Sequence, residues 1–98
     1  MKPSELIADV RHFTTGTLAR NSRGIPCGTA SDSGAVAFDC LGAFLWCYPI
    51  ATDRRPADKK QRSIAKELFA LCEARFDHRM LGKLDHAEAL DLLRSVGI

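Results

Sequence analysis

The stretch from Asp32 to Pro49 most strongly constrains how this chain can fold. It reads D-S-G-A-V-A-F-D-C-L-G-A-F-L-W-C-Y-P, and apart from Asp39 its residues are apolar or small on every side. A helix that is apolar all round is buried among other elements, and Pro49 marks its end. At 18 residues with an acid inside, the stretch is too weak for a membrane span. We therefore predict a buried central helix around which the other elements pack.

The residues before this stretch predict a helix and a β-hairpin. Residues 4–13 read as a short helix, because Ser4 is a suitable N-cap and apolar residues recur behind it at helical spacing. The β-branched and short residues of 14–20 favour a strand. Gly24 can supply the positive φ of a turn, and the segment around Pro26 then returns as a short edge strand. An isolated hairpin is marginal in water, so we expect it to lie on the helices.

The residues after the stretch predict two amphipathic helices. Asp58 is expected to cap the first, which runs to about His78. Asp85 is expected to cap the second, and Gly97 lies just past its end. The apolar stripe of the first helix comprises Ile64, Leu68, Leu71, Cys72 and Phe76.

Together these elements predict a mainly helical α+β fold: an N-terminal helix, a short β-hairpin, a buried central helix and two amphipathic C-terminal helices. With 98 residues, 46% hydrophobic and 27% charged, the chain suits a single small globular domain over residues 1–98. The first nine residues contain acids and no long apolar run. We therefore expect no signal peptide, no membrane partner and a cytoplasmic location.

The four cysteines, at positions 27, 40, 47 and 72, match no zinc-binding spacing. Cys40 and Cys47 are seven residues apart, which on one helix places them on the same face but too far apart to bridge. The sequence therefore predicts reduced thiols that act as small hydrophobic residues, and no metal site.

Residues 13–20 read F-T-T-G-T-L-A-R, and residues 35–38 and 41–44 read A-V-A-F and L-G-A-F. The pattern resembles an uncharacterised family of small bacterial and phage proteins, a domain of unknown function. In that family an aromatic-Thr-x-Gly-x-x-Ala-Arg hairpin precedes a Leu-Gly-Ala helix and a C-terminal amphipathic helix. The chain departs from this pattern at Asp39-Cys40 and at Leu84-Asp85-His86. The resemblance implies the fold and, by association, a phage or prophage accessory protein directed at a host. It supplies no activity.

Asp39 is the sharpest single feature, because a carboxylate within an apolar helix must be paired, protonated or at a gap in the surface. The hairpin must cover the central helix, so Arg20 is the expected partner, with His12 as the alternative. We predict a buried polar pair of Asp39 and Arg20. The competing interpretation is a site acid, with an enzyme or small-ligand module centred on Asp39.

No catalytic motif accompanies this acid. His12, His78 and His86 do not form a ligand pattern, and the glycine-rich phosphate-binding motifs are absent. The sequence predicts no catalytic residue and no cofactor, which favours a non-enzymatic protein.

The positive charge of the chain is concentrated in residues 54–66, where six Lys/Arg stand against one acid. Most of these cations open the first amphipathic helix, where the helix dipole disfavours them. A partner-binding surface is one interpretation, and a solvated face that maintains solubility is the other. Trp46 is interpreted as a core residue or, if its side chain is exposed, as a residue that contacts the partner. The predicted partner-binding residues are Arg54, Arg55, Lys59, Lys60, Arg62, Lys66 and Trp46.

These observations favour a small non-enzymatic binding protein. The resemblance implies that it docks on a host protein or protein complex, as an inhibitor or adaptor, for example of a defence complex. A nucleic-acid-associated protein that uses the basic run of residues 54–66 is the alternative. Aromatic residues are not interleaved with that run, which makes base stacking the weaker expectation.

Overall fold

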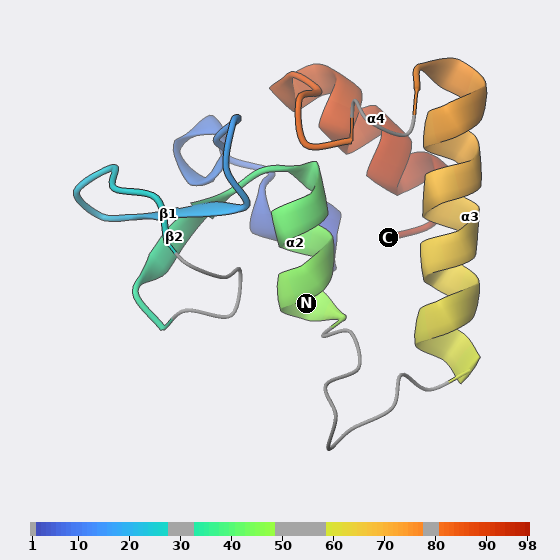
Figure 1. The fold of residues 1–98 in the computed structure, drawn as a ribbon, viewed down its shortest axis with the longest axis horizontal. Coiled ribbons are helices and arrows are strands. Elements are labelled where there is room, and N and C mark those ends of the chain that lie inside the picture. Colours follow the sequence, from blue (N-terminus) through green and yellow to red (C-terminus); the bar gives the residue numbers. More distant parts are fainter. Residues whose placement is uncertain (1, 28–32, 49–58, 78–80) are drawn as a thin grey trace.

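The computed structural model describes residues 2–27, 33–48, 59–77 and 81–98. It confirms the mainly helical α+β fold over these residues (Figure 1). The elements are, in chain order, α1 (Pro3–Leu6), the 3-10 turn η1 (Val10–His12), β1 (Ala19–Asn21), β2 (Ala35–Phe38), α2 (Cys40–Cys47), α3 (Lys59–Arg75) and α4 (His86–Ser95).

Helix α2 lies in the middle of the molecule and contacts α1, α4 and β2 (Figure 1). Its side chains Cys40, Ala43 and Phe44 are fully buried. The core continues through Ile7, Leu68 and the buried leucines of residues 81–93. The prediction of a buried central helix is confirmed, although this helix has only eight residues. Within the described segments, no helix is long and apolar enough to cross a bilayer.

The predicted helix of residues 32–49 is wrong in its first half, because residues Ala35–Phe38 form β2. Asp39 then has extended backbone angles, φ −82° and ψ −178°, and is the N-cap of α2. The physical reason is that an aspartate is unfavourable inside a helix and strongly favoured at its N-cap. The β-branched Val36 and the aromatic Phe38 also favour a strand before that cap.

The strand partner is also different from the predicted one. β1 pairs antiparallel with β2, with Ala19 opposite Phe38 and Arg20 opposite Ala37. The segment around Pro26 forms only an isolated bridge to Arg20. The turn between them is confirmed, with Gly24 at φ +77°. Because a proline cannot donate a hydrogen bond to a β-ladder, the longer strand that pairs with β1 is β2 and not the segment around Pro26.

The N-terminal helix is shorter than the predicted span of residues 4–13. α1 ends at Leu6, and η1 begins after Asp9, whose carboxylate accepts from the amide of Arg11. Ser4 lies within α1 and not at its cap, and its amide donates to the carbonyl of Ile98 at 3.0 Å. This hydrogen bond fixes the first helix against the last residue of the chain.

The two C-terminal helices are confirmed, with corrections to the first of them. Asp85 and Glu88 form a complete capping box at the start of α4, and Gly97 follows the helix at φ +83°. Leu68 of α3 is fully buried, but Phe76, the residue after α3, is 38% exposed. The predicted cap Asp58 and the predicted end at His78 lie outside the described residues.

Candidate functional site

Asp39 is buried, as predicted, with 3% of its surface exposed. Its Oδ1 accepts a hydrogen bond from the amide of Gly42 at 2.6 Å, and the amide of Leu41 also donates to the carboxylate. Burial raises the pKa of Asp39 to about 6, although the hydrogen bonds from these two amides act in the opposite direction and lower it. The carboxylate is therefore held by the backbone at the start of α2.

The predicted pair of Asp39 and Arg20 is wrong, because the two described side chains have other hydrogen-bond partners. The Nε of Arg20 donates to Oγ1 of Thr14 at 2.8 Å, and its Nη1 donates to the carbonyl of Gly24 at 2.9 Å. The alternative partner, His12, has its Nδ1 3.1 Å from the carbonyl of Val36. Sequence reasoning sought a side-chain partner because it placed Asp39 inside a helix. An N-cap acid takes its partners from the backbone instead.

The buried thiols are poor nucleophiles in this fold. Cys40 and Cys72 are both 0% exposed. Burial raises the pKa of Cys40 to about 12, and the neighbouring Asp39 and Cys72 contribute. The pKa of Cys72 is raised as well, again mainly by burial. A thiolate is the form that attacks or binds metals, so both residues act as core side chains. No group of three His, Cys, Asp or Glu residues suited to a metal ion occurs in the described part of the chain.

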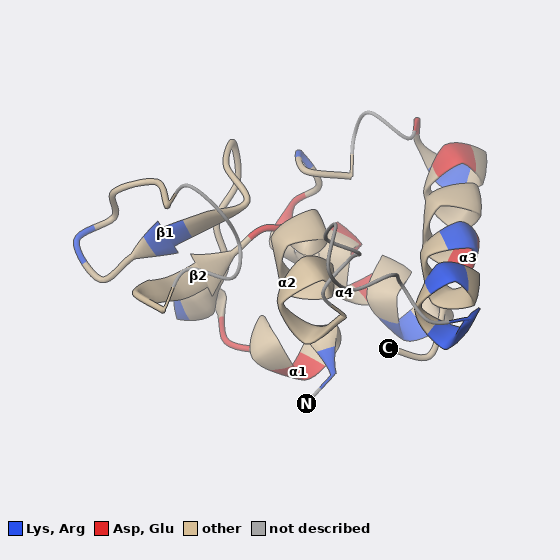
Figure 2. Cartoon of the chain, turned by 60° about the horizontal axis from the view of Figure 1, so that its bottom comes forward, with Lys and Arg blue, Asp and Glu red and all other residues tan. Residues whose placement is uncertain are grey.

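The basic run is placed mainly on α3. Lys59, Lys60, Arg62 and Lys66 are all exposed, and the first turn of α3 contains no acid. Figure 2 shows these cations in the N-terminal half of the helix. Arg54 and Arg55 lie outside the described residues. The structure thus gathers the four described cations on one exposed element.

Sequence reasoning missed an exposed surface on the same helix. Positions 62, 66, 69, 73 and 76 are spaced by four, three, four and three residues, which places them along one face of a helix. All five side chains are exposed, including Phe69 at 37% and Phe76 at 38%. This spacing was the signal available in the sequence. We call this surface the α3 stripe, and it comprises Arg62, Lys66, Phe69, Glu73 and Phe76.

Trp46 lies near the C-terminal end of α2 and is 37% exposed. Its ring packs against Phe38, with the ring centroids 5.3 Å apart. Val36 of β2 is exposed as well, at 42%. Trp46 is thus partly core and partly surface, and it lies on a different element from the α3 cations.

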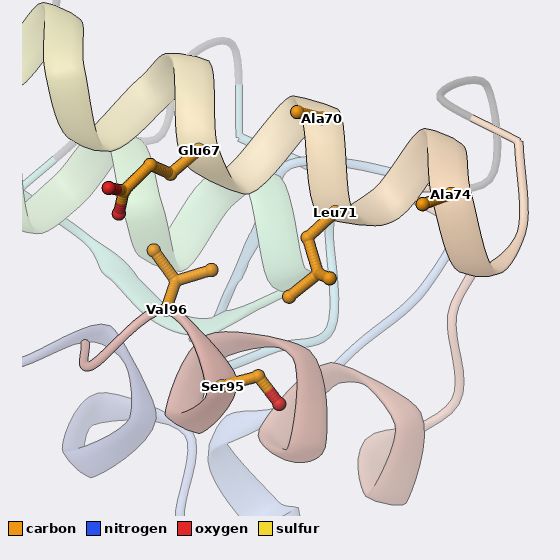
Figure 3. Close-up of a pocket in the computed structure, with 6 residues that line it drawn as sticks. All are labelled: Glu67, Ala70, Leu71, Ala74, Ser95 and Val96. Atoms are coloured by element: carbon orange, nitrogen blue, oxygen red, sulfur yellow. The ribbon is translucent and has the colours of Figure 1, made fainter.

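An open groove of about 500 Å³ runs between α3 and α4 (Figure 3). The carboxylate of Glu67 and the side chains of Leu71 and Val96 project into it. Arg75 links the two helices, with its Nη1 2.9 Å from Oδ2 of Asp91. The lining residues are Glu67, Ala70, Leu71, Ala74, Ser95 and Val96. Among these described residues there is no nucleophile with an adjacent base.

Comparison with known proteins gives no match to a family model, a curated protein or a solved structure. A function for this chain must therefore be inferred from the geometry of the described residues. Among these residues, α3 carries four exposed cations and the exposed Phe69.

Proposed function

We propose that this chain is a small non-enzymatic binding protein that docks on an acidic partner protein through the N-terminal half of α3. The observation that carries the proposal is the exposure of four cations, Lys59, Lys60, Arg62 and Lys66, in the N-terminal half of α3, whose first turn contains no acid. The cations of the first turn, Lys59 and Lys60, act against the helix dipole at a cost of about 0.3–1 kcal/mol each. A partner with negative charge would offset that cost on binding.

Exposed aromatic surface beside the cations supports a protein partner. Phe69 follows Lys66 by three residues on the same face of α3 and is 37% exposed. Aromatic side chains ringed by charged residues are typical anchors of protein interfaces. A host protein or protein complex, in which this chain acts as an inhibitor or adaptor, is the partner that the family resemblance suggests.

A nucleic acid is the second candidate, because the same cations can contact phosphates. The positions of the cations favour it less. Lys59, Arg62 and Lys66 fall on one side of α3, whereas Lys60 lies about 160° around the helix from Arg62. They therefore do not form the single row that follows a phosphate backbone. Asp39 has a structural reason to be buried, the cap of α2, so we propose no catalytic role for it.

The test is a charge reversal that leaves the α3 stripe intact. In the first variant Arg54, Arg55, Lys59 and Lys60 become Glu. In the matched control the same change is made at Lys2, Arg23, Lys83 and Arg94, four exposed cations outside α3. Both variants and the unaltered chain are used for affinity capture, and then titrated with a labelled random DNA duplex at two salt concentrations.

We expect the unaltered chain and the control to capture the same acidic protein, and the first variant to lose it. Random DNA should not compete for that protein. Tight duplex binding with a salt slope near −0.9 per neutralised phosphate, lost in the first variant alone, would instead establish the nucleic-acid function. Equal capture by all three proteins would show that Arg54, Arg55, Lys59 and Lys60 do not bind the partner and form a solvated face.

A further inference from the structure

The groove between α3 and α4 has a lining that the proposed function does not use. Leu71 and Val96 give it apolar walls, and the carboxylate of Glu67 projects into it (Figure 3). The side chain of Glu67 makes no hydrogen bond or ion pair with any other residue in the described segments. Among the described lining residues, Glu67 is also the only charged one. The groove therefore suits a group that combines apolar surface with one positive charge.

The turn that follows β1 carries such a group at its tip. Arg23, Ile25 and Pro26 are exposed there, and Ile25 has 54% of its surface exposed. The guanidinium of Arg23 has no partner among the described residues either. One short turn thus presents an exposed isoleucine beside an unpaired cation.

Hydrogen bonds within the turn hold this tip in one conformation. The Oδ1 of Asn21 accepts from the amides of Arg23 and Ile25, at 2.9 and 3.1 Å. The amide of Gly24 donates to the carbonyl of Asn21, and the carbonyl of Gly24 accepts from Nη1 of Arg20. Because these three amides already have acceptors, the tip can enter an apolar groove without leaving them unpaired. Its fixed conformation also reduces the entropy lost on binding.

We infer that the groove binds the turn of a second copy of this chain, with Arg23 facing Glu67 and Ile25 against the apolar walls. The turn and α3 lie at opposite ends of the longest axis of the molecule, which extends 35 Å (Figure 1). One copy therefore cannot place its turn in its own groove. The contact joins different surfaces of the two copies, and such head-to-tail contacts generate rings or open chains.

The occupant is a second copy and not an unrelated protein, because the chain itself presents both halves of the contact. The groove supplies the acid and the apolar walls, and the turn supplies the cation and the isoleucine. No residue of either half belongs to the cations assigned to the acidic partner. A groove of about 500 Å³ holds one turn and buries less than the roughly 1,600 Å² of a standard interface. We therefore expect weak association that increases with concentration.

Sedimentation velocity at increasing protein concentration tests the inference with variants of exposed residues. Ile25→Glu should weaken association at least roughly tenfold, because it sets a carboxylate against the apolar walls and against Glu67. Val10→Glu is the matched control, since Val10 is 63% exposed and lies on η1, and it should associate as the unaltered chain does. Thermal melts confirm that each variant is folded.

A charge swap tests the pairing of Arg23 with Glu67. Arg23→Glu and Glu67→Arg should each weaken association, and the double variant should restore it, because opposite charges then meet again at every contact. Glu5→Arg is the control for Glu67→Arg, since Glu5 is an exposed acid of α1 outside the groove. It should leave association unchanged.

A mixture of two defective variants tests the head-to-tail arrangement. Ile25→Glu retains an intact groove, whereas Ala70→Glu places a carboxylate in the groove lining and retains an intact turn. Each variant alone should be monomeric at concentrations where the unaltered chain associates. An equimolar mixture should form a dimer and nothing larger, because only one intact turn and one intact groove can meet.

Four results would overturn the inference. They are an unaltered chain that stays monomeric at millimolar concentration, equal association of Ile25→Glu and Val10→Glu, a double charge variant as weak as the single ones, and a mixture that stays monomeric. A groove that instead accepts a segment of another protein would give the first of these results.

Failure of this inference is distinguishable from failure of the proposed function. The capture variant changes no residue of the turn or the groove, so it should associate as the unaltered chain does. The capture control includes Arg23→Glu, so it should retain the acidic protein and yet self-associate weakly. Self-association without capture would reject only the proposed function, and capture without self-association would reject only this inference.

Discussion

The carbonyl oxygen of Leu18 lies 1.8 Å from the position that a Cβ on Gly42 would occupy. Gly42 is in the first turn of α2, where its amide donates to the carboxylate of the cap Asp39. The same carbonyl of Leu18 accepts from the amide of Asp39 at 3.3 Å. The segment that leads into β1 is therefore held directly against the start of the central helix, backbone against backbone.

Gly42→Ala should be strongly destabilising. Alanine normally stabilises a helix interior by about 1 kcal/mol over glycine, but here its methyl group meets a backbone oxygen that cannot rotate away. We expect a loss of about 3 kcal/mol or more in the free energy of unfolding, measured by urea denaturation. Ser63→Ala, at an exposed position of α3, is the control and should be neutral or slightly stabilising. A neutral Gly42→Ala would mean that Leu18 does not approach α2 this closely.

The capping role of Asp39 is separated from its charge by comparing two neutral variants. Asp39→Asn retains an oxygen that can accept from the amides of Leu41 and Gly42, whereas Asp39→Ala leaves those amides without it. We expect Asp39→Ala to be less stable than Asp39→Asn by about 1–2 kcal/mol. Urea denaturation of the two variants at the same pH gives the difference. Equal stability of the two variants would show that the side-chain oxygen does not cap α2.

The charge of Asp39 should make stability depend on pH. Its pKa is raised from 3.8 to about 6 in the folded chain, mainly by burial, so the folded state binds the extra proton between pH 4 and 6. Stability is therefore greater below about pH 4 and is lost as the pH rises through 6. The shift corresponds to roughly 3 kcal/mol, and the 3% exposure of Asp39 leaves little solvent to screen it.

Asp39→Asn removes this titration and is the reference for it. The free energy of unfolding of Asp39→Asn minus that of the unaltered chain should increase from pH 4 to pH 7 and then level off. Subtracting the two curves cancels the other groups that titrate in both proteins. A difference that is constant across this range would contradict the raised pKa.

The thiols of Cys40 and Cys72 should resist alkylation in the folded protein. Both are fully buried, and burial raises the pKa of each, so little thiolate is present at neutral pH. Native protein treated with iodoacetamide and analysed by peptide mass spectrometry should show these two residues unmodified after an exposed model thiol has reacted fully. In denaturant both should react. Labelling of Cys40 at the rate of the model thiol would contradict its place in the core.

Local signals predicted α4 well because they act within a few residues. Asp85 ahead of the apolar pattern indicates an N-cap, and a glycine past that pattern indicates the end of the helix. Both features are present in the structure. The mainly helical α+β class followed from such local signals together with the buried central stretch.

The interpretation of residues 32–49 failed where two patterns overlap. A short apolar run is compatible with a strand or with a buried helix, and only the pairing of β2 with β1, many residues away, decides between them. The acid within the run was the signal for a boundary, because Asp39 is a better cap than interior residue. Its partners could not be predicted from side chains, since they are backbone amides.

The α3 stripe could be predicted only in part. The five positions are visible in the sequence as one helical face, but their exposure depends on how α3 rotates against the rest of the molecule. Leu68 and Cys72 fix that rotation by being fully buried. Phe76 was assigned to the same buried stripe, yet it lies eight residues from Leu68, about 80° further around the helix, and is 38% exposed.

The cations at the start of α3 should lower the stability of the chain, which gives a last prediction independent of any partner. Lys59 and Lys60 lie in the first turn, where unpaired amides and the helix dipole favour negative charge. Replacing both with Glu should raise the free energy of unfolding by about 0.6–2 kcal/mol at low salt. The control is Arg23→Glu with Lys83→Glu, which makes the same change of net charge in exposed turns. That pair should change stability much less, because neither residue lies within the first turn of a helix.

Salt separates the dipole effect from a change in packing. The gain from the Lys59 and Lys60 reversal should shrink toward zero in 1 M salt, where the Debye length falls to about 3 Å. A gain that persists at high salt would mean that the new side chains stabilise α3 by contacts and not by charge. A loss of stability in the reversal, with the control unchanged, would mean that these lysines support the fold. In that case the cost that motivates a binding surface at this helix start does not exist.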